Sequence, residues 1–412
     1  MADEAFASLP FREQLAFFRR KLNLPTSGWT DVWRAEHDWA FVVAGANRDA
    51  IVADFREAVQ KAIDGGSTLE AFRRDFDRIV ATHGWDYNGG RDWRSRVIYD
   101  TNLNTSYQAG RYEQLQQAPF WQYEHQDWVE NPRETHVAWD GLVLSRDDPW
   151  WQTHYPPNDW GCHCRVHGLW PRDLQRLGKA GPDQAPEVRY VEKTIGARSE
   201  LGPRTVRVPE GIGPGWDYAP GAARLRSAIP PERPAPLGPS SSTGGEGLPN
   251  RRPTDTLPPP RPFARADLLP PGGAPEDYVS NFLGRFGATL DAPAVVRDVI
   301  GERLVIGAPL FQNADGEWKV LKNGREVYLP LLAQAILEPD EIWVRLEWLF
   351  AQQRAVVRRR YVARFDVDGS GVPALVVFEL GPDGWSGVTA FQAREGAAED
   401  ARLGVRLYRR QE

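Results

Sequence analysis

The first part of the chain repeats apolar residues at the spacing of α-helices. Within residues 49–64 an apolar side chain returns at every fourth position: Ile51, Phe55, Val59 and Ile63. Side chains four residues apart lie on one face of a helix, so the segment is predicted to be an amphipathic helix. The same reasoning predicts helices over residues 67–84, where Gly84 ends the pattern, and over residues 91–117.

The pattern changes after residue 120. Residues 120–168 lack a regular period, are rich in aromatic side chains and contain turn-forming pairs such as Asp140-Gly141. This composition predicts a small irregular module of strands and loops. Core packing is the more common role of a single tryptophan, but on an extended segment Trp150 and Trp151 would point in opposite directions, which favours an interface role for that pair. Helices followed by such a module form an α+β arrangement.

The last part of the chain consists mostly of short strand-like runs separated by turns. Residues 326–337 predict a helix, although Pro330 is unfavourable in its middle. Strand-like runs lie before and after that helix, at residues 303–307, 310–312, 317–322, 341–349, 355–367, 373–380 and 386–391. Glycine-containing turns join the later runs, which predicts an antiparallel sheet. We therefore expect a second small α+β domain, in which a helix covers one face of the sheet.

A proline-rich segment separates the two parts. Fourteen of the 34 prolines fall within residues 229–275, among Ser and Gly and with few aromatic side chains. Such a segment buries too little apolar surface to offset the cost of ordering the chain, and its prolines favour extended structure. The sequence thus predicts a domain over residues 1–222, a linker over residues 223–275 and a domain over residues 276–412.

Composition and charge exclude several classes of protein. The 412 residues carry 50 Lys and Arg against 56 Asp and Glu, a net charge of −6. That balance argues against a protein whose whole surface coats nucleic acid. No run of about 18 apolar residues predicts a membrane span, and the acidic start with Asp3 and Glu4 does not resemble a secretory signal. Two cysteines cannot form a disulfide scaffold, so we expect a reducing cytoplasmic compartment.

Histidine and cysteine gather in residues 132–168. His136, His154, Cys162 and Cys164 could complete a tetrahedral zinc shell, and a small module with few helices gains stability from such an ion. The sequence therefore predicts a structural Zn²⁺ site. A second interpretation stays open, in which two buried free thiols lie beside hydrogen-bonded histidines. Two enzymatic alternatives are a catalytic Cys–His pair and a zinc-dependent hydrolase centred on His136 and Asp140.

An arginine-rich strand is the second candidate for chemistry. Strand alternation places Arg358, Arg360 and Arg364 on one face of the predicted sheet. Guanidinium groups there could stabilise the charge that develops on a cleaved phosphodiester. The candidate catalytic residues are Arg358, Arg360, Glu347 as base and Thr389. Glu379 is an alternative base.

Other observations limit that interpretation. All seven histidines lie before residue 168, so the last domain cannot use a two-histidine ribonuclease mechanism. A solvated arginine face paired with local carboxylates explains the same pattern without catalysis. A domain that binds without cleaving also fits.

Three long motifs in order carry a family resemblance. They are PFREQLAFFRRKLNLPTSGWTDVWRAEHDWAFVVAGA, GWDYNGGRDWRSRVIYDTNLNTSYQAGRYEQL and HVAWDGLVLSRDDPWWQTHYPPNDWGCHCRV. The sequence resembles the phage Mu F-like head morphogenesis (minor head) proteins over about residues 8–222. The recurrent family positions correspond here to His136, Asp140-Gly141 and the run from Cys162 to Arg165. The resemblance implies a virion protein, of a phage or prophage, at the portal vertex that acts in head assembly, with a role in DNA delivery as an extension.

Residues 276–412 resemble a second group, the phage barnase/EndoU/colicin/RelE-like nuclease domains. The motifs ILEPDEIW and RRRYVARF carry this resemblance. It implies a nuclease fold and leaves the activity open. The expected partners are the portal and other capsid proteins and packaged DNA, with host RNA for the last domain. The expected locations are the virion and, during assembly, the host cytoplasm. The alternative function is an RNase-type toxin that uses the head module for packaging.

Overall fold

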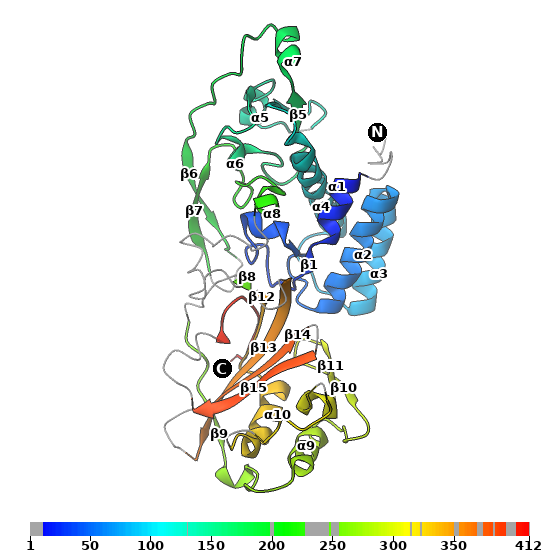
Figure 1. Cartoon of the computed structure of the whole chain (residues 1–412), viewed down its shortest axis with the longest axis vertical. Coiled ribbons are helices and arrows are strands. Elements are labelled where there is room, and N and C mark those ends of the chain that lie inside the picture. Colours follow the sequence, from blue (N-terminus) through cyan, green and yellow to red (C-terminus); the bar gives the residue numbers. More distant parts are fainter. Residues whose placement is uncertain are drawn as a thin grey trace. The chain divides into compact units, whose positions relative to one another are not determined.

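The structure of the protein is a computed structural model. It describes residues 11–129, 131–197, 202–226, 247–248, 255–313, 315–321, 324–349, 354–368, 374–381, 384–392 and 401–411. The chain divides into two compact units at about residue 231. We call them the N-terminal unit and the C-terminal unit and describe each by itself (Figure 1).

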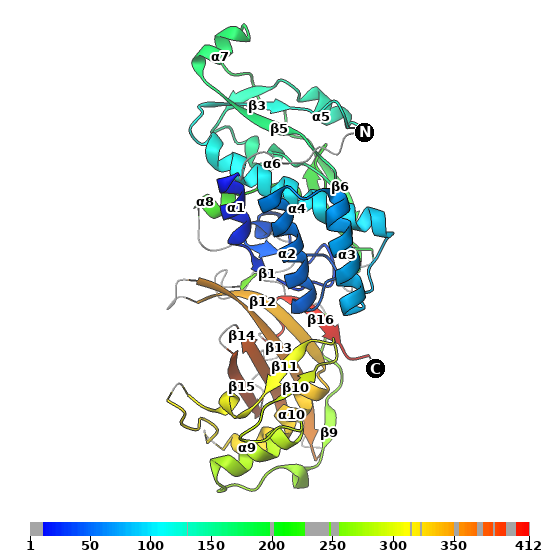
Figure 2. The ribbon, with the colours of Figure 1, turned by 90° about the vertical axis from the view of Figure 1, so that its right-hand side faces the viewer.

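The N-terminal unit begins with a group of helices. Helix α1 (Arg12–Arg19) packs on α4 (Arg91–Leu115), and α2 (Asp49–Gly65) lies beside α3 (Leu69–His83) (Figure 2). The three predicted helices are confirmed. Thr68 accepts a hydrogen bond from the backbone N–H of Ala71 and so caps α3. Gly84 ends α3 at a φ of 55°, in the left-handed region that favours glycine.

Aromatic and aliphatic side chains form the core of this helical part. Its largest fully buried members are Phe18, Phe41, Phe55, Phe72 and Phe76. Each such side chain contributes about 1.5–3 kcal/mol by leaving water. A short parallel pair, β1 (Leu22–Asn23) with β2 (Ala40–Phe41), and the 3₁₀ turn η1 (Arg34–Asp38) connect α1 to α2.

The predicted irregular module follows α4. Strand β3 (Phe120–Glu124) lies between β4 (Val143–Ser145) and β5 (Arg165–Leu169), with both pairs antiparallel. The remaining elements are α5 (Glu134–Ala138), α6 (Trp151–His154), α7 (Pro171–Arg176), the hairpin β6 (Tyr190–Ile195) and β7 (Arg204–Pro209), and α8 (Ala222–Arg226).

The tryptophan pair of this module does not behave as predicted. Trp150 and Trp151 are both buried, at 4% and 2% exposure, and Trp151 begins α6. The segment turns into a helix instead of staying extended, so both rings point into the core. They pack there against Trp121, Tyr123 and Tyr155.

The C-terminal unit is built on an antiparallel sheet in the order β15-β14-β13-β12-β16. Its strands are β12 (Glu341–Leu349), β13 (Arg354–Val367), β14 (Ala374–Gly381), β15 (Gly384–Gln392) and β16 (Val405–Arg409). Two short strands join it: β8 (Gly247–Leu248) pairs with β12, and β9 (Arg261–Phe263) pairs in parallel with β13. Helices α9 (Pro275–Gly284) and α10 (Leu329–Leu337) pack together, and α10 contacts β13, β14 and β15.

Two details of this unit differ from the sequence prediction. Pro330 lies in the first turn of α10, where its missing N–H needs no partner, so the helix begins at Leu329 and is not interrupted. The runs at 310–312 and 317–322 are not strands among the described residues. The first belongs mostly to the 3₁₀ turn η3 (Ala308–Phe311), and only Gln312 and Trp318 form a bridge.

The other small elements of this unit are the hairpin β10 (Ala294–Arg297) with β11 (Arg303–Ile306) and the 3₁₀ turns η2 (Arg265–Asp267) and η4 (Glu326–Tyr328).

About half of the predicted linker lies outside the described residues, in 227–246 and 249–254. Residues 255–275 have a defined place in the C-terminal unit, because they include β9 and η2. No helix among the described residues combines the length and the apolar character that crossing a bilayer requires. The α+β class, helical first and sheet-based afterwards, is confirmed.

Candidate functional site

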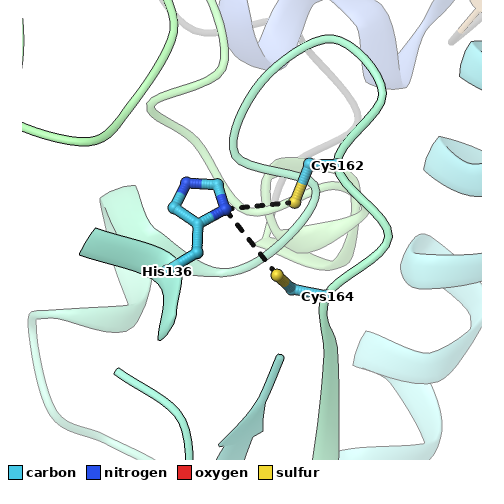
Figure 3. A group of neighbouring side chains, drawn as sticks. All are labelled: His136, Cys162 and Cys164. Carbon is cyan, nitrogen blue, oxygen red and sulfur yellow. Dashed lines mark hydrogen bonds between the residues drawn. The ribbon is translucent and has the colours of Figure 1, made fainter. Parts of the chain in front are cut away.

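Three of the four predicted metal ligands come together in the N-terminal unit. His136 lies on α5, Cys162 lies in the loop after α6, and Cys164 directly precedes β5. Their ligand atoms lie within 4.8 Å of one another, and all three residues are buried (Figure 3). His136 Nδ1 is 3.7 Å from each of the two sulfur atoms. We call these three residues the Cys–His group.

The geometry of the Cys–His group fits zinc. Zn–S bonds of about 2.3 Å and Zn–N bonds of about 2.0 Å in a tetrahedral shell place sulfur and nitrogen about 3.5 Å apart. The second ring nitrogen of His136, Nε2, lies 2.9 Å from the carbonyl oxygen of Gly211. Nε2 therefore donates to that carbonyl, which leaves the lone pair of Nδ1 directed at the sulfurs.

Ionisation of the two thiols is coupled. The Cys164 thiol hydrogen-bonds the sulfur of Cys162 and, with a contribution from His136, lowers the pKa of Cys162 well below its ordinary value. The same interaction raises the pKa of Cys164, because a second thiolate would form beside the first one. One thiolate is thus favoured, and a thiolate is the form that binds metal.

Two neutral side chains of α4 hold the loop that carries the cysteines. The Asn104 amide donates to the carbonyl oxygen of Cys162 at 2.5 Å, and the Gln108 amide donates to that of Cys164 at 3.0 Å. The contact of Gln108 accounts for one of the polar residues that α4 buries. The sequence analysis missed them, because Asn and Gln inside a helix have no distinctive spacing.

His154 is not a member of the Cys–His group. Its Nδ1 lies 3.2 Å from the carbonyl oxygen of Trp150 and 2.8 Å from the Thr153 hydroxyl, and its ring stacks on Trp150 at 4.3 Å. Burial lowers the pKa of His154 to about 4, so its ring is neutral near pH 7. Aromatic packing and local hydrogen bonds account for this histidine.

His125, which the sequence analysis missed, lies beside the Cys164 sulfur. It is buried, and its Nδ1 lies 3.5 Å from the Cys164 sulfur. It follows β3, whose Glu124 pairs with Arg165 of β5, so the strand pairing brings residues 125 and 164 together. Asp140 accepts a hydrogen bond from the backbone N–H of His125 at 2.8 Å and thereby fixes that turn.

The predicted arginine face lies on β12 and β13 of the C-terminal unit. Arg345 pairs directly with Arg358 across the two strands, and Trp343 pairs with Arg360. The Glu347 carboxylate lies 2.7 Å from Arg345 Nη2, 3.3 Å from Arg358 Nε and 3.8 Å from Arg360 Nη2. Among the described side chains, Glu347 is thus the carboxylate around which three guanidiniums lie.

The other predicted residues of this face are placed by strand register. Glu379 pairs with Arg360, and Thr389 pairs with Val377 on the next strand. The side chains of Glu379 and Thr389 lie outside those that the structure describes. Arg364 is directed elsewhere, because it donates to the carbonyl oxygen of Leu257 at 2.9 Å.

Known families match each of the two units. The model of the family described as Phage Mu protein F like protein matches residues 53–167. The model described as phage-Barnase-EndoU-ColicinE5/D-RelE like nuclease2 matches residues 281–409.

Two curated proteins are similar to this chain, and no solved structure matches it. One is the putative capsid assembly protein F of Escherichia phage Mu, 34% identical over 250 residues, which are 54% of this chain and 56% of that protein. The other is the Mu-like prophage FluMu F protein of Haemophilus influenzae, 32% identical over 227 residues, 50% of this chain and 55% of that protein. The chain therefore spans about half the length of the curated relatives it matches. Both resemblances are confirmed: the chain carries a Mu F-like domain followed by a phage barnase/EndoU/colicin/RelE-like nuclease domain.

Proposed function

We propose that this protein acts in phage head assembly, as a minor head protein that associates with the portal. The observation that carries the proposal is the similarity of more than half of the chain to a protein named as a capsid assembly protein. The expected partners are the portal and other capsid proteins, and a role in DNA delivery extends the same proposal. The expected locations are the virion of a phage or prophage and the host cytoplasm during assembly.

Quantitative mass spectrometry of purified particles tests this role. The protein should be present at a few copies per particle, and a tagged portal should retain it when particles are dissociated. Detection only in infected or induced cells, with none in particles, would contradict a virion role.

The Cys–His group is proposed to hold a structural Zn²⁺, with His125 as the fourth ligand. Two sulfurs and two imidazole nitrogens are a donor set that zinc prefers. When bound, the ion would cross-link α5, the end of β3 and the start of β5, which are short elements. The catalytic Cys–His pair and the hydrolase centred on His136 and Asp140 are less favoured, since Asp140 and His136 Nε2 both bond to backbone groups.

For the C-terminal unit we propose cleavage of RNA on the arginine face. Arg358 and Arg360 would stabilise the charge on the phosphodiester, Glu347 would take a proton, and Thr389 would lie nearby. The support is the nuclease-like match together with the three guanidiniums that gather around Glu347.

A second candidate function is an RNase-type toxin that the particle delivers to a new host. The observation in its favour is that a nuclease-like domain is joined to a head protein domain in one chain. Growth arrest on expression of the full chain, together with its presence in particles, would favour delivery. Presence in particles without any effect on growth or RNA would favour a domain that binds without cleaving.

A further inference from the structure

A second arginine cluster lies at the β12–β16 edge of the C-terminal unit. Arg402, Arg406 and Arg409 surround Glu341, whose side chain is fully buried. Glu341 accepts from Arg402 Nε at 2.7 Å, from Arg409 Nη1 at 3.1 Å and from Arg406 Nη1 at 3.3 Å. The indole of Trp343 also donates to it, at 2.7 Å. Glu341 is therefore the permanent counter-charge that orients the three guanidiniums.

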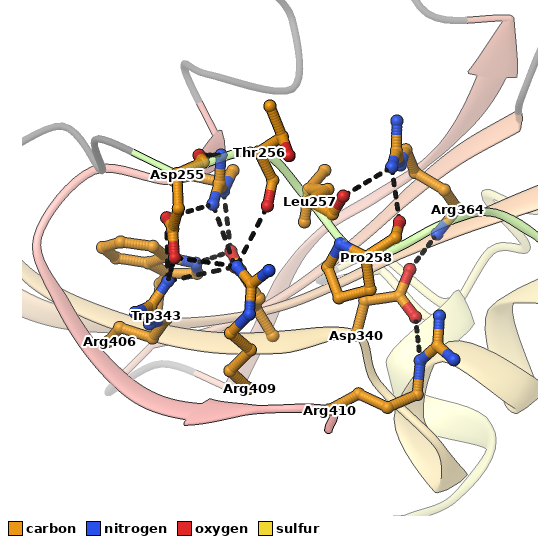
Figure 4. A network of polar contacts seen from close by, with 12 residues as sticks. Asp255, Thr256, Leu257, Pro258, Asp340, Trp343, Arg364, Arg406, Arg409 and Arg410 are labelled. Carbon is orange, nitrogen blue, oxygen red and sulfur yellow. Dashed lines mark hydrogen bonds and ion pairs between the residues drawn. The ribbon is translucent and has the colours of Figure 1, made fainter. Parts of the chain in front are cut away.

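A second carboxylate reaches the same cluster from the segment before β9. Asp255 lies 2.8 Å from Arg406 Nη1, 3.0 Å from Arg402 Nη2 and 2.9 Å from Arg409 Nη1 (Figure 4). Unlike Glu341, the Asp255 side chain is 37% exposed. The guanidiniums hold the pKa of Asp255 below its ordinary value, although desolvation acts in the opposite direction. Asp255 is thus an ionised and solvent-accessible partner.

The backbone carbonyls of the residues after Asp255 also accept hydrogen bonds from arginines. Thr256 accepts from Arg409 at 3.0 Å, and Pro259 accepts from Arg410 at 2.8 Å. Between them, the carbonyls of Leu257 and Pro258 both accept from Arg364. We call residues 255–259 the acceptor strap. It presents a row of oxygen atoms to a row of guanidiniums, and its prolines have no N–H to donate.

This arrangement has the chemistry of a nucleic-acid backbone bound to arginines. A phosphodiester carries one negative charge and two exposed oxygens, and guanidinium forks bind such oxygens in pairs. Asp255 is the more exposed of the two described carboxylates that contact all three guanidiniums, so a phosphodiester would bind the cluster by taking the place of Asp255.

We propose that Arg402, Arg406 and Arg409 form a binding site for a nucleic-acid phosphodiester, and that the acceptor strap occupies this site as an internal mimic. The site adjoins the arginine face, because Trp343 pairs with Arg406 on β16 and with Arg360 on β13. The proposal goes beyond cleavage, since binding of a phosphate at this cluster requires no reaction.

Binding by the full chain tests the proposal directly. The probe is a fluorescein-labelled 2′-O-methyl RNA of about 12 nucleotides, with a DNA of the same sequence as the second arm. Fluorescence anisotropy should show at least about tenfold tighter binding by Asp255→Asn than by the unchanged chain. The double variant Asp255→Asn with Arg406→Gln should lose that gain. The matched control is Asp267→Asn, which removes the same charge from an exposed position in η2 and should not tighten binding.

Two results would overturn the proposal. One is equal affinity of Asp255→Asn and Asp267→Asn when both melt at the temperature of the unchanged chain. The other is measured on the unchanged chain with saturating RNA, so it does not depend on the stability of Asp255→Asn. Amide hydrogen exchange in residues 255–263 should become faster as RNA displaces the acceptor strap. Unchanged or slower exchange would contradict displacement. Binding of both RNA and DNA, or of RNA alone, supports the site. RNA cleavage is measured separately, so failure of catalysis leaves this test intact.

Discussion

The Cys–His group of the N-terminal unit and the Glu341 cluster of the C-terminal unit bury polar groups in opposite ways. In the N-terminal unit the Cys–His group is surrounded by neutral partners: the amides of Asn104 and Gln108 and the carbonyl of Gly211. In the C-terminal unit the buried polar groups are ions, such as Glu341 among three arginines. Neutral hydrogen bonds fix one geometry, whereas guanidiniums can exchange one anion for another. The first arrangement suits a permanently bound structural ion, and the second suits a reversibly bound ligand.

The largest expected effect concerns the Cys–His group. Cys164→Ser should reduce bound zinc from about one ion per chain to near zero and lower the melting temperature by on the order of 10 °C, because the ion cross-links short elements. Elemental analysis after zinc-replete purification and a thermal melt measure both quantities. His154→Gln is the matched control and should retain zinc, while His125→Ala should weaken zinc binding. Full zinc content in Cys164→Ser would refute the proposed site.

The second effect concerns the arginine face. The double variant Arg358→Ala with Arg360→Ala should lower the rate of RNA cleavage by about 10²–10³-fold, because the charge on the phosphodiester would lose its donors. Cleavage of a labelled RNA by the full chain is the measurement. Arg265→Ala removes an exposed arginine of η2 and should leave the rate unchanged. If the double variant cleaves as fast as the unchanged chain, these arginines belong to a solvated, ion-paired face.

The smallest expected effect concerns His154, which is buried as a neutral ring. Burial lowers the pKa of His154 in the native state to about 4, whereas the pKa of an unfolded histidine is about 6.5. Between these values the unfolded state takes up a proton that the native state does not, so stability falls as pH decreases. The contribution of His154 to the free energy of unfolding that is lost over this pH range is about 3 kcal/mol. Urea unfolding at pH 7 and pH 4.5 should show a smaller pH dependence for His154→Gln, and an identical dependence would contradict burial of the neutral ring.

The helices and the later strands were predictable from local patterns in the sequence. Residues 51, 55, 59 and 63 all contribute to one face of α2, and β12 and β13 are rich in the β-branched and aromatic residues typical of strands. Strand β16 could not be predicted, since it is short and pairs with β12, about sixty residues earlier in the chain. Its arginines therefore showed no relation to Glu341 in the sequence.

The sequence predicted that histidine and cysteine form a metal site, but it did not identify all four residues of that site correctly. Clustering of histidine and cysteine identified His136, Cys162 and Cys164, which the fold brings together. His154 has the right chemistry and the right neighbourhood in sequence, but the helical turn of α6 stacks it on Trp150. His125 lies before the cluster and reaches Cys164 only through the pairing of β3 with β5. The turn of α6 decided the first case, and strand register, which a single sequence does not reveal, decided the second.

The position of β16 has a consequence for synthesis of the chain. Glu341 leaves the ribosome with β12, but the guanidiniums that neutralise it arrive only after β13, β14 and β15 have been made. Until then a carboxylate destined for complete burial has none of these three partners, and the sheet lacks one edge. Translation order thus makes closure of this domain a late event. The complete domain therefore forms only after the strand that carries Arg406 and Arg409 has emerged.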